Sequence, residues 1–152
     1  MIKDLLREDR VVLDMKAKTK EEALRELVDV LNLSEDKKEI LFKALMQREV
    51  LGSTGIGKGI AIPHSRSIVV DNITLVVGVS KEGVEFDSLD GKPVHLFFML
   101  IATPNDPSMK YLTALGSIAR ISRSIAHEGE IRTDFSSPKE LIDYILEHAD
   151  EQ

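Results

Sequence analysis

A histidine that directly follows a proline is the first feature of this sequence that could do chemistry. His64 comes after Pro63, at the end of the apolar run Ile60–Ile62. Proline fixes the backbone at this point and removes a competing N–H group. Histidine is substantially neutral at neutral pH, so one ring nitrogen keeps a lone pair that can attack phosphorus. We expect His64 to be a nucleophile at the end of a strand. A purely structural histidine is the alternative, and the sequence leaves open which nitrogen would react.

Residues 52–59, with the sequence GSTGIGKG, form a glycine-rich segment just before that run. The segment differs from a nucleotide-binding P-loop, because Gly59 stands where a Ser or Thr would hold Mg²⁺. The dinucleotide-binding fingerprint also fails, since Ile60 occupies the position of its last glycine. A nucleotide-dependent kinase or ATPase is therefore the hypothesis that these residues disfavour.

The same segment can bind phosphate in another way. Glycines such as Gly55 and Gly57 let backbone N–H groups turn inward and surround an anion. Ser53 and Thr54 add hydroxyl donors. The alternative is a surface turn in which these hydroxyls only make turn hydrogen bonds.

Arg48 stands sixteen residues before His64. Its planar guanidinium can grip phosphate oxygens with two N–H groups at once. The alternative is that Arg48 caps the end of its helix, where a positive charge is favourable. The sequence contains no Asp- or Asn-rich metal motif, so we expect neither a metal nor another cofactor.

Composition excludes several classes of protein. The chain has 152 residues, 20 Lys and Arg, 26 Asp and Glu, and no Cys, which gives a net charge of −6. Disulfides, thiol nucleophiles and Cys-ligated metals are therefore excluded, and the acidic balance argues against nucleic acid as a partner. No apolar run approaches the ~20 residues that span a bilayer, and the first ten residues do not form a signal peptide. We expect a cytoplasmic protein, without membrane insertion, whose residues 1–152 form a single domain.

Hydrophobic periodicity and capping residues predict an α/β sandwich, with a small mixed sheet flanked by helices. Capping patterns at Thr19 and Ser34 each start a helix, and a third, at Ser137-Pro138, starts the last one. Another helix is expected from about Ser108 to Ala126. We expect its inward positions to be Leu112, Leu115, Ile118 and Ala119. Strands are expected at Val11–Met15, Ile60–Ile62, Ile73–Val79 and Val94–Ala102, the last two covered on both faces.

Taken together, Arg48-Glu49, the run STGIG at 53–57 and the run GIAIPH at 59–64 resemble a known family. It is the enzyme IIA domain of the fructose/mannitol type of the phosphotransferase system, which includes the nitrogen-regulatory enzyme IIA. The first-helix segment 20–24 and the DGKPV run at 90–94 extend the resemblance to about Val11–Leu146.

The resemblance implies a phosphotransferase that works as a phosphohistidine relay. His64 would be phosphorylated by an HPr-type phosphocarrier protein, and Arg48 would be the arginine of the site. The phosphoryl group would then pass to an enzyme IIB component, on a cysteine, for sugar uptake. In the nitrogen-type branch, the phosphorylation state would instead control a regulated target protein.

The sequence departs from the family pattern near the site. Ser65 follows the histidine, where Gly or Ala is usual, and it could donate a hydrogen bond to phosphate. Tyr111 takes the place of a second histidine that many members carry on the late helix. A phenol can donate to phosphate but cannot supply an imidazole. Lys58 replaces a small polar residue and adds a cation to the glycine segment.

Overall fold

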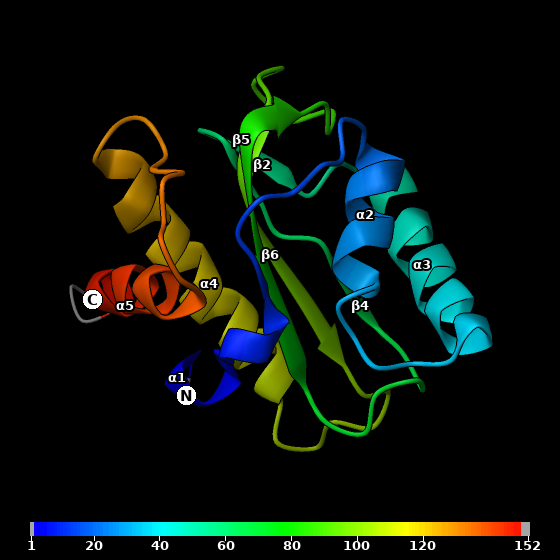
Figure 1. Ribbon diagram of the computed structural model, residues 1–152. Coiled ribbons are helices and arrows are strands. Elements are labelled where there is room, and N and C mark those ends of the chain that lie inside the picture. The colour runs from blue at the N-terminus through cyan, green and yellow to red at the C-terminus, as the bar shows by residue number, and fades with distance from the viewer. Residues whose placement is uncertain (1, 150–152) are drawn as a thin grey trace.

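A computed structural model describes residues 2–149, which form three layers with a sheet between two groups of helices (Figure 1). The helices α2 and α3 cover one face, and α1, α4 and α5 cover the other. The helices are α1 Ile2–Leu5, α2 Lys20–Val28, α3 Glu35–Val50, α4 Lys110–His127 and α5 Pro138–Ala149, with a 3₁₀ turn at Glu8–Arg10. The strands are β1 Val11–Val12, β2 Gly55–Gly57, β3 Ile60–Ala61, β4 His64–Arg66, β5 Thr74–Val84 and β6 Val94–Ala102. The predicted α/β class with a mixed sheet is confirmed.

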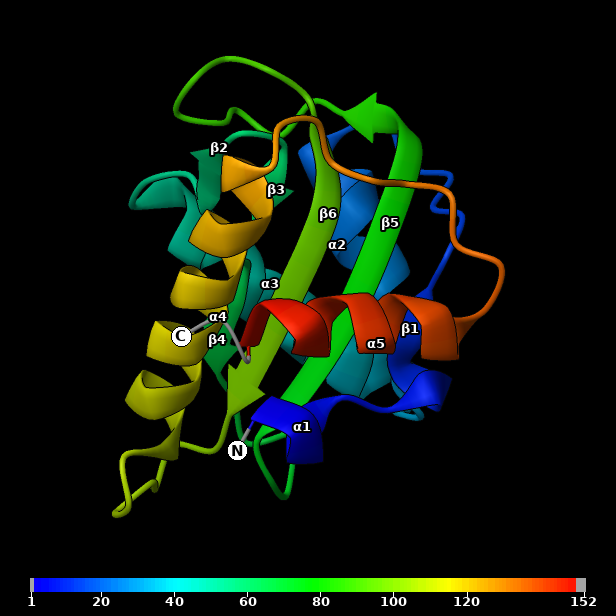
Figure 2. The same cartoon turned by 90° about the vertical axis from the view of Figure 1, so that its left-hand side faces the viewer.

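The sheet is built around β6. Its strand order is β1-β5-β6-β3-β2, and β4 also pairs with β6, beyond the end of β3. The pair β5–β6 is antiparallel, whereas β3 and β4 both run parallel to β6. Both long strands are buried along most of their length, as their continuous apolar runs predict. Figure 2 shows α4 and α5 in front of these strands, with α2 and α3 behind them.

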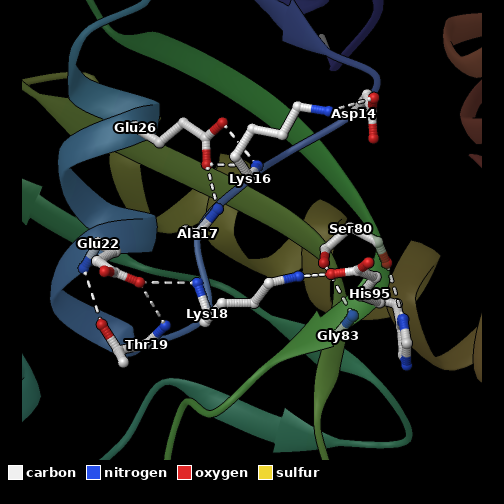
Figure 3. Close-up of polar contacts among 11 residues, drawn as sticks. Asp14, Lys16, Ala17, Lys18, Thr19, Glu22, Glu26, Ser80, Gly83 and His95 are labelled. Atoms are coloured by element: carbon white, nitrogen blue, oxygen red, sulfur yellow. Dashed lines mark hydrogen bonds and ion pairs between the residues drawn. The ribbon is translucent and has the colours of Figure 1, made fainter.

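Local sequence explains where the helices start. Thr19 and Glu22 form the predicted capping box, in which the Thr19 hydroxyl accepts from the Glu22 N–H and the Glu22 carboxylate accepts from the Thr19 N–H (Figure 3). The segment before α2 is held in the same way, because the Glu26 carboxylate accepts from the N–H groups of Lys16 and Ala17. Ser34 caps α3 through the Lys37 N–H. The predicted starts of both helices are confirmed.

Pro63 changes the expected strand near the histidine. The sequence predicts one strand that ends at Pro63-His64, but the structure has β3 ending at Ala61 and β4 starting at His64. Proline has no N–H to donate to the ladder, so the pairing with β6 is interrupted there. The Pro63 carbonyl still accepts from the Leu100 N–H at 2.9 Å. His64 is therefore the first residue of a short strand that pairs with β6, beyond the end of β3.

The predicted late helix is confirmed as α4, but one prediction about its inward face is wrong. The helix begins at Lys110, two residues after the approximate start, because Met109 adopts a left-handed φ of 54°. Leu112 does not point inward and is 55% exposed. The buried face is instead Tyr111, Ala114, Ile118, Ile121, Ser122 and Ile125.

Candidate functional site

His64 lies at the start of β4, opposite Leu100 of β6, and its side chain is partly buried. Its Nδ1 atom lies 2.7 Å from the carbonyl oxygen of Ile62. A carbonyl oxygen can only accept, so Nδ1 carries the proton and donates it. The other ring nitrogen, Nε2, then keeps its lone pair. The fold thus fixes the tautomer that the sequence left open.

The surroundings of His64 favour the neutral imidazole. Burial is the main cause that lowers its pKa below 6.5, and the positive charge of Arg48 lowers it further. The bond to Ile62 raises the pKa more than the charge of Arg48 lowers it, and Glu49 raises it slightly, but burial outweighs these effects and the pKa is lowered. A neutral imidazole with a free Nε2 lone pair is the form that a nucleophile requires.

Tyr111, in the first turn of α4, faces His64 across the site. The two rings meet edge to face, with centroids 6.1 Å apart and planes at 60°. Tyr111 is only 8% exposed. Burial raises the pKa of its phenol to about 12, even though the nearby Arg66 and Arg48 guanidinium groups lower it. The phenol therefore stays protonated and remains a hydrogen-bond donor.

Arg48 comes from the last turn of α3. Its Nη1 atom donates to the Gly52 carbonyl oxygen at 2.7 Å, which ties the helix end to the following loop. Its charge also acts on both His64 and Tyr111. Arg48 thus bonds to the loop just beyond its helix, and its positive charge reaches the histidine; the grip on phosphate oxygens stays a prediction.

The glycine segment folds as a hairpin of β2 and β3 rather than as a loose loop. Lys58 and Gly59 in its tight turn both have positive φ, 58° and 82°, as in the type I′ turn that is common in two-residue hairpins. Gly57 and Lys58 lie against the Asp90 carboxylate, which accepts from the Lys58 N–H at 2.9 Å. The Gly55 N–H donates to the Ser53 hydroxyl at 3.1 Å. These amides are therefore engaged in forming the hairpin.

The three predicted hydroxyl donors also have partners within the fold. Ser53 donates to the Phe86 carbonyl at 2.9 Å, and the buried Thr54 hydroxyl donates to the Glu49 carboxylate. Ser65 donates to the Arg66 carbonyl at 3.0 Å. Because side chains alternate along a strand, Ser65 lies on the opposite face of β4 from His64. The structure thus brings together His64, Arg48 and Tyr111, whereas the three hydroxyls bond to other groups of the fold.

Sequence reasoning missed two charged residues beside this group. Glu49 is buried and accepts from the Thr54 N–H at 3.0 Å, and it lies 3.1 Å from the Lys20 ammonium group. It thereby joins α2, α3 and the glycine segment. Arg66, two residues after His64, lies over the Tyr111 ring. The spacing of His64 and Arg66 along a strand was the signal that could have identified Arg66.

The other histidines lie in separate environments. The Nδ1 atom of His95 lies 2.8 Å from the Ser80 carbonyl oxygen (Figure 3), which fits the predicted structural role. His148 is buried and contacts Ser124 and Glu128, whereas His127 is exposed at the end of α4. Between residues 2 and 149, no group of three or more His, Asp or Glu side chains is arranged to hold a metal ion.

Comparison with known proteins assigns the chain to a family. Residues 4–148 match the family described as "Phosphoenolpyruvate-dependent sugar phosphotransferase system, EIIA 2". The chain belongs to this family, as its motifs suggest, and it therefore belongs to a class of phosphotransfer components.

Two branches of the family are represented among its relatives. The chain is 37% identical to the fructose-specific EIIABC component of Bacillus subtilis, over 97% of this chain and 23% of that protein. It is also 35% identical to a nitrogen regulatory protein of Bradyrhizobium diazoefficiens, over 80% of each chain. It thus spans less than a quarter of the first relative but most of the second.

Solved structures show the same fold. The nitrogen regulatory protein IIA-Ntr of Neisseria meningitidis superimposes with a TM-score of 0.78 at 31% identity, over 95% of this chain and 98% of that one. The IIA mannitol protein of Escherichia coli has a TM-score of 0.69 at 22% identity, over 92% and 98% of the two chains, and shows the fold alone. Among the described residues, no helix combines the length and apolarity needed to cross a membrane.

Proposed function

We propose that this protein carries a phosphoryl group on His64, within the phosphoenolpyruvate-dependent phosphotransferase system of the cytoplasm. The observation that carries the proposal is the 2.7 Å contact between His64 Nδ1 and the Ile62 carbonyl oxygen. This contact leaves Nε2 unprotonated, and partial burial keeps the ring neutral. Both conditions are required for attack on phosphorus.

The bonds that form and break in the transfer step involve only the donor and this histidine. The Nε2 lone pair forms the new N–P bond while the P–N bond to the donor imidazole breaks, and the electron pair of that bond leaves with the donor nitrogen. Negative charge is spread over the three equatorial phosphoryl oxygens, so catalysis rests on positioning and charge stabilisation. We assign Arg48 and the Tyr111 hydroxyl to those oxygens. The segment that Arg48 holds would be shaped by Ser53, Thr54, Gly55 and Gly57. Ser65 would continue strand β4 after His64.

The partners follow from the family. The donor would be an HPr-type phosphocarrier protein, and the acceptor an enzyme IIB component whose thiolate takes the phosphoryl group. A solved complex of an enzyme IIA with phosphorylated enzyme IIB, for mannitol in Escherichia coli, contains a chain of this fold at 22% identity and a TM-score of 0.68. Exposed apolar side chains beside Arg48 and Tyr111, namely Val50, Leu51, Met109 and Leu112, suit transient docking.

A regulatory role is the second candidate. It is favoured by the match to nitrogen regulatory proteins, which in Bradyrhizobium diazoefficiens extends over 80% of both chains. The chemistry on His64 is the same in both roles. They differ in whether the phosphoryl group leaves for an enzyme IIB or whether its presence changes the binding of another protein.

The test is a reconstituted relay. The protein is incubated with radiolabelled phosphoenolpyruvate, enzyme I and the cognate HPr-type carrier. We expect acid-labile label on the protein, its loss in His64→Ala, and its retention in the control His127→Gln, which changes an exposed histidine on α4. Chasing the labelled protein with a cysteine-bearing enzyme IIB separates the roles, because label moves to IIB only in the transport role. Absence of label with cognate donors, or labelling by ATP alone, would contradict the proposal.

A further inference from the structure

Tyr111 is held between two side chains of one strand. His64 and Arg66 are two residues apart on β4, so they project from the same face. The His64 ring meets the Tyr111 ring edge to face. The Arg66 guanidinium carbon lies 4.7 Å from the centroid of the same ring. A guanidinium at that distance is attracted to the face of a phenol and restricts its rotation.

Arg66 is itself fixed by the segment that leads into α4. Its Nη1 atom donates to the Thr103 carbonyl oxygen at 3.0 Å and lies 3.9 Å from the Asp106 carboxylate. One guanidinium therefore joins strand β4, the end of strand β6 and the loop before α4. A lysine could not make these contacts together, because it lacks the planar fork.

Asp106 connects this arrangement to the backbone of Tyr111. Met109 precedes α4 in a left-handed conformation and supplies no side-chain cap. The Asp106 carboxylate takes over that role, since it accepts from the Lys110 N–H at 3.1 Å and from the Tyr111 N–H at 2.9 Å. These bonds, with the charge of Arg66, lower the pKa of Asp106, so the carboxylate is ionised and pairs with Arg66. Arg66 thus restrains Tyr111 at its ring and, through Asp106, at its backbone.

We propose that Arg66 is a positioning residue for phosphoryl transfer, which acts by holding the Tyr111 hydroxyl in place to donate to the phosphoryl group on His64. This proposal rests on the proposed function of His64. Arg66 acts through the Tyr111 ring and the Asp106 cap, whereas Arg48 is the cation assigned to contact the phosphoryl oxygens. A hydroxyl held in advance loses less freedom when the transition state forms, which is the benefit of positioning.

The test compares Arg66→Gln, Tyr111→Phe and the double variant in single-turnover transfer from the phosphorylated HPr-type carrier. We expect Arg66→Gln to lower the maximal rate about tenfold, less than the ~10²-fold that a 1 Å misplacement can cost, with an unchanged KM for the carrier. The double variant should be no slower than Tyr111→Phe, because Arg66 acts only through that hydroxyl. Arg66→Lys should stay slow.

A second readout detects positioning directly. The chain has two tyrosines, so Tyr144→Phe leaves Tyr111 as the one tyrosine whose ring signals NMR observes. Arg66→Gln should accelerate its ring flips in that background. The matched control is Arg132→Gln, which removes a guanidinium 4.4 Å from the Phe135 ring, between α4 and α5. It should change neither the rate nor the Tyr111 signals.

Each outcome decides between the two proposals. If the unmodified protein takes no label, the function of His64 fails. If it is labelled normally and Arg66→Gln transfers at the same rate, the role of Arg66 fails while that of His64 stands. Additive losses in the double variant, full recovery in Arg66→Lys, or a raised KM alone would also overturn it. Additive losses would mean that Arg66 contacts the phosphoryl group directly, and full recovery by lysine would mean that only its positive charge matters. A raised KM alone would mean that Arg66 takes part in docking of the partner.

Discussion

The His64 Nδ1 atom and the Ile62 carbonyl oxygen lie 2.7 Å apart, so a main-chain group two residues earlier sets the tautomer of the imidazole. We predict that the phosphoryl group is attached to Nε2. Nitrogen and phosphorus NMR of the phosphorylated protein distinguish the two phosphohistidine isomers. The same spectra before phosphorylation should show the proton on Nδ1. A phosphoryl group found on Nδ1 would mean that the contact with Ile62 breaks during transfer.

The acceptance of a phosphoryl group should depend on the protonation of His64. Burial and the charge of Arg48 lower the pKa of His64 below 6.5. The rate should therefore be constant above that pKa and fall as the pH drops through it, because the imidazolium has no lone pair on Nε2. An NMR titration should place the midpoint of His64 below 6.5, and Arg48→Gln should move it upward by removing a nearby positive charge. A midpoint above 6.5 would contradict the expected effect of burial.

Arg48 is expected to contribute to both the chemistry and the local structure. Arg48→Ala should lower the transfer rate about 10²-fold, the typical cost of losing one preorganised donor to a developing anion. Arg48→Lys should recover only part of that rate, since an ammonium group cannot replace the fork. Because Arg48 also bonds to the Gly52 carbonyl, urea unfolding of each variant is measured alongside. A rate loss that simply follows the loss of stability would remove Arg48 from the site.

Glu49, the neighbour of Arg48 in the sequence, is expected to contribute to the stability of the fold. Its side chain is 2% exposed, and that of its partner Lys20 is 14% exposed. Glu49→Gln leaves the Lys20 ammonium group with only the exposed Asp87 carboxylate, 3.7 Å away, and weakens the bonds from Thr54 to a buried side chain. It should therefore cost about 1–3 kcal/mol of unfolding free energy.

The matched control for Glu49 is the surface pair Arg25–Glu39, whose side chains are 49% and 44% exposed. Glu39→Gln should cost no more than ~1 kcal/mol. Urea denaturation measures both variants. Equal effects at the two positions would show that the contacts of Glu49 with Thr54 and Lys20 add no more stability than an exposed ion pair does.

The sequence predicts much of this fold because the decisive signals are local. Capping residues at Thr19 and Ser34 place two helix starts, and the apolar run Val94–Ala102 is the central strand. These signals depend on hydrogen bonds and burial within a few residues of the chain. Pro63 is also a local signal, because it has no N–H to donate. That it divides the strand into β3 and β4 depends on the pairing with β6, which the sequence does not show.

The site is predicted less completely, for a physical reason. His64 is recognisable from the motif, whereas Arg66 becomes relevant only because β4 and α4 bring it to Tyr111. The glycine segment illustrates the same limit, since its composition suggests an anion-binding loop but does not reveal that cross-strand pairing folds it into a hairpin. Leu112 was expected in the core because it is apolar. The neighbouring Tyr111 takes that place instead, and Leu112 faces outward.

The exposure of Leu112 leads to a prediction about docking. It follows Tyr111 in the first turn of α4 and is 55% exposed, so a partner that reaches His64 would cover it. Leu112→Glu should leave stability unchanged, because an acidic residue suits the first turn of a helix. It should raise the KM for the phosphorylated carrier about tenfold, equivalent to ~1.4 kcal/mol of lost association free energy, while the rate at saturation stays the same.

The control is Ile40→Glu. It replaces an apolar side chain that is 48% exposed and lies about 12 Å along α3 from Arg48. If both variants raise KM equally, the effect is one of net charge, and the surface around Leu112 has no special part in docking.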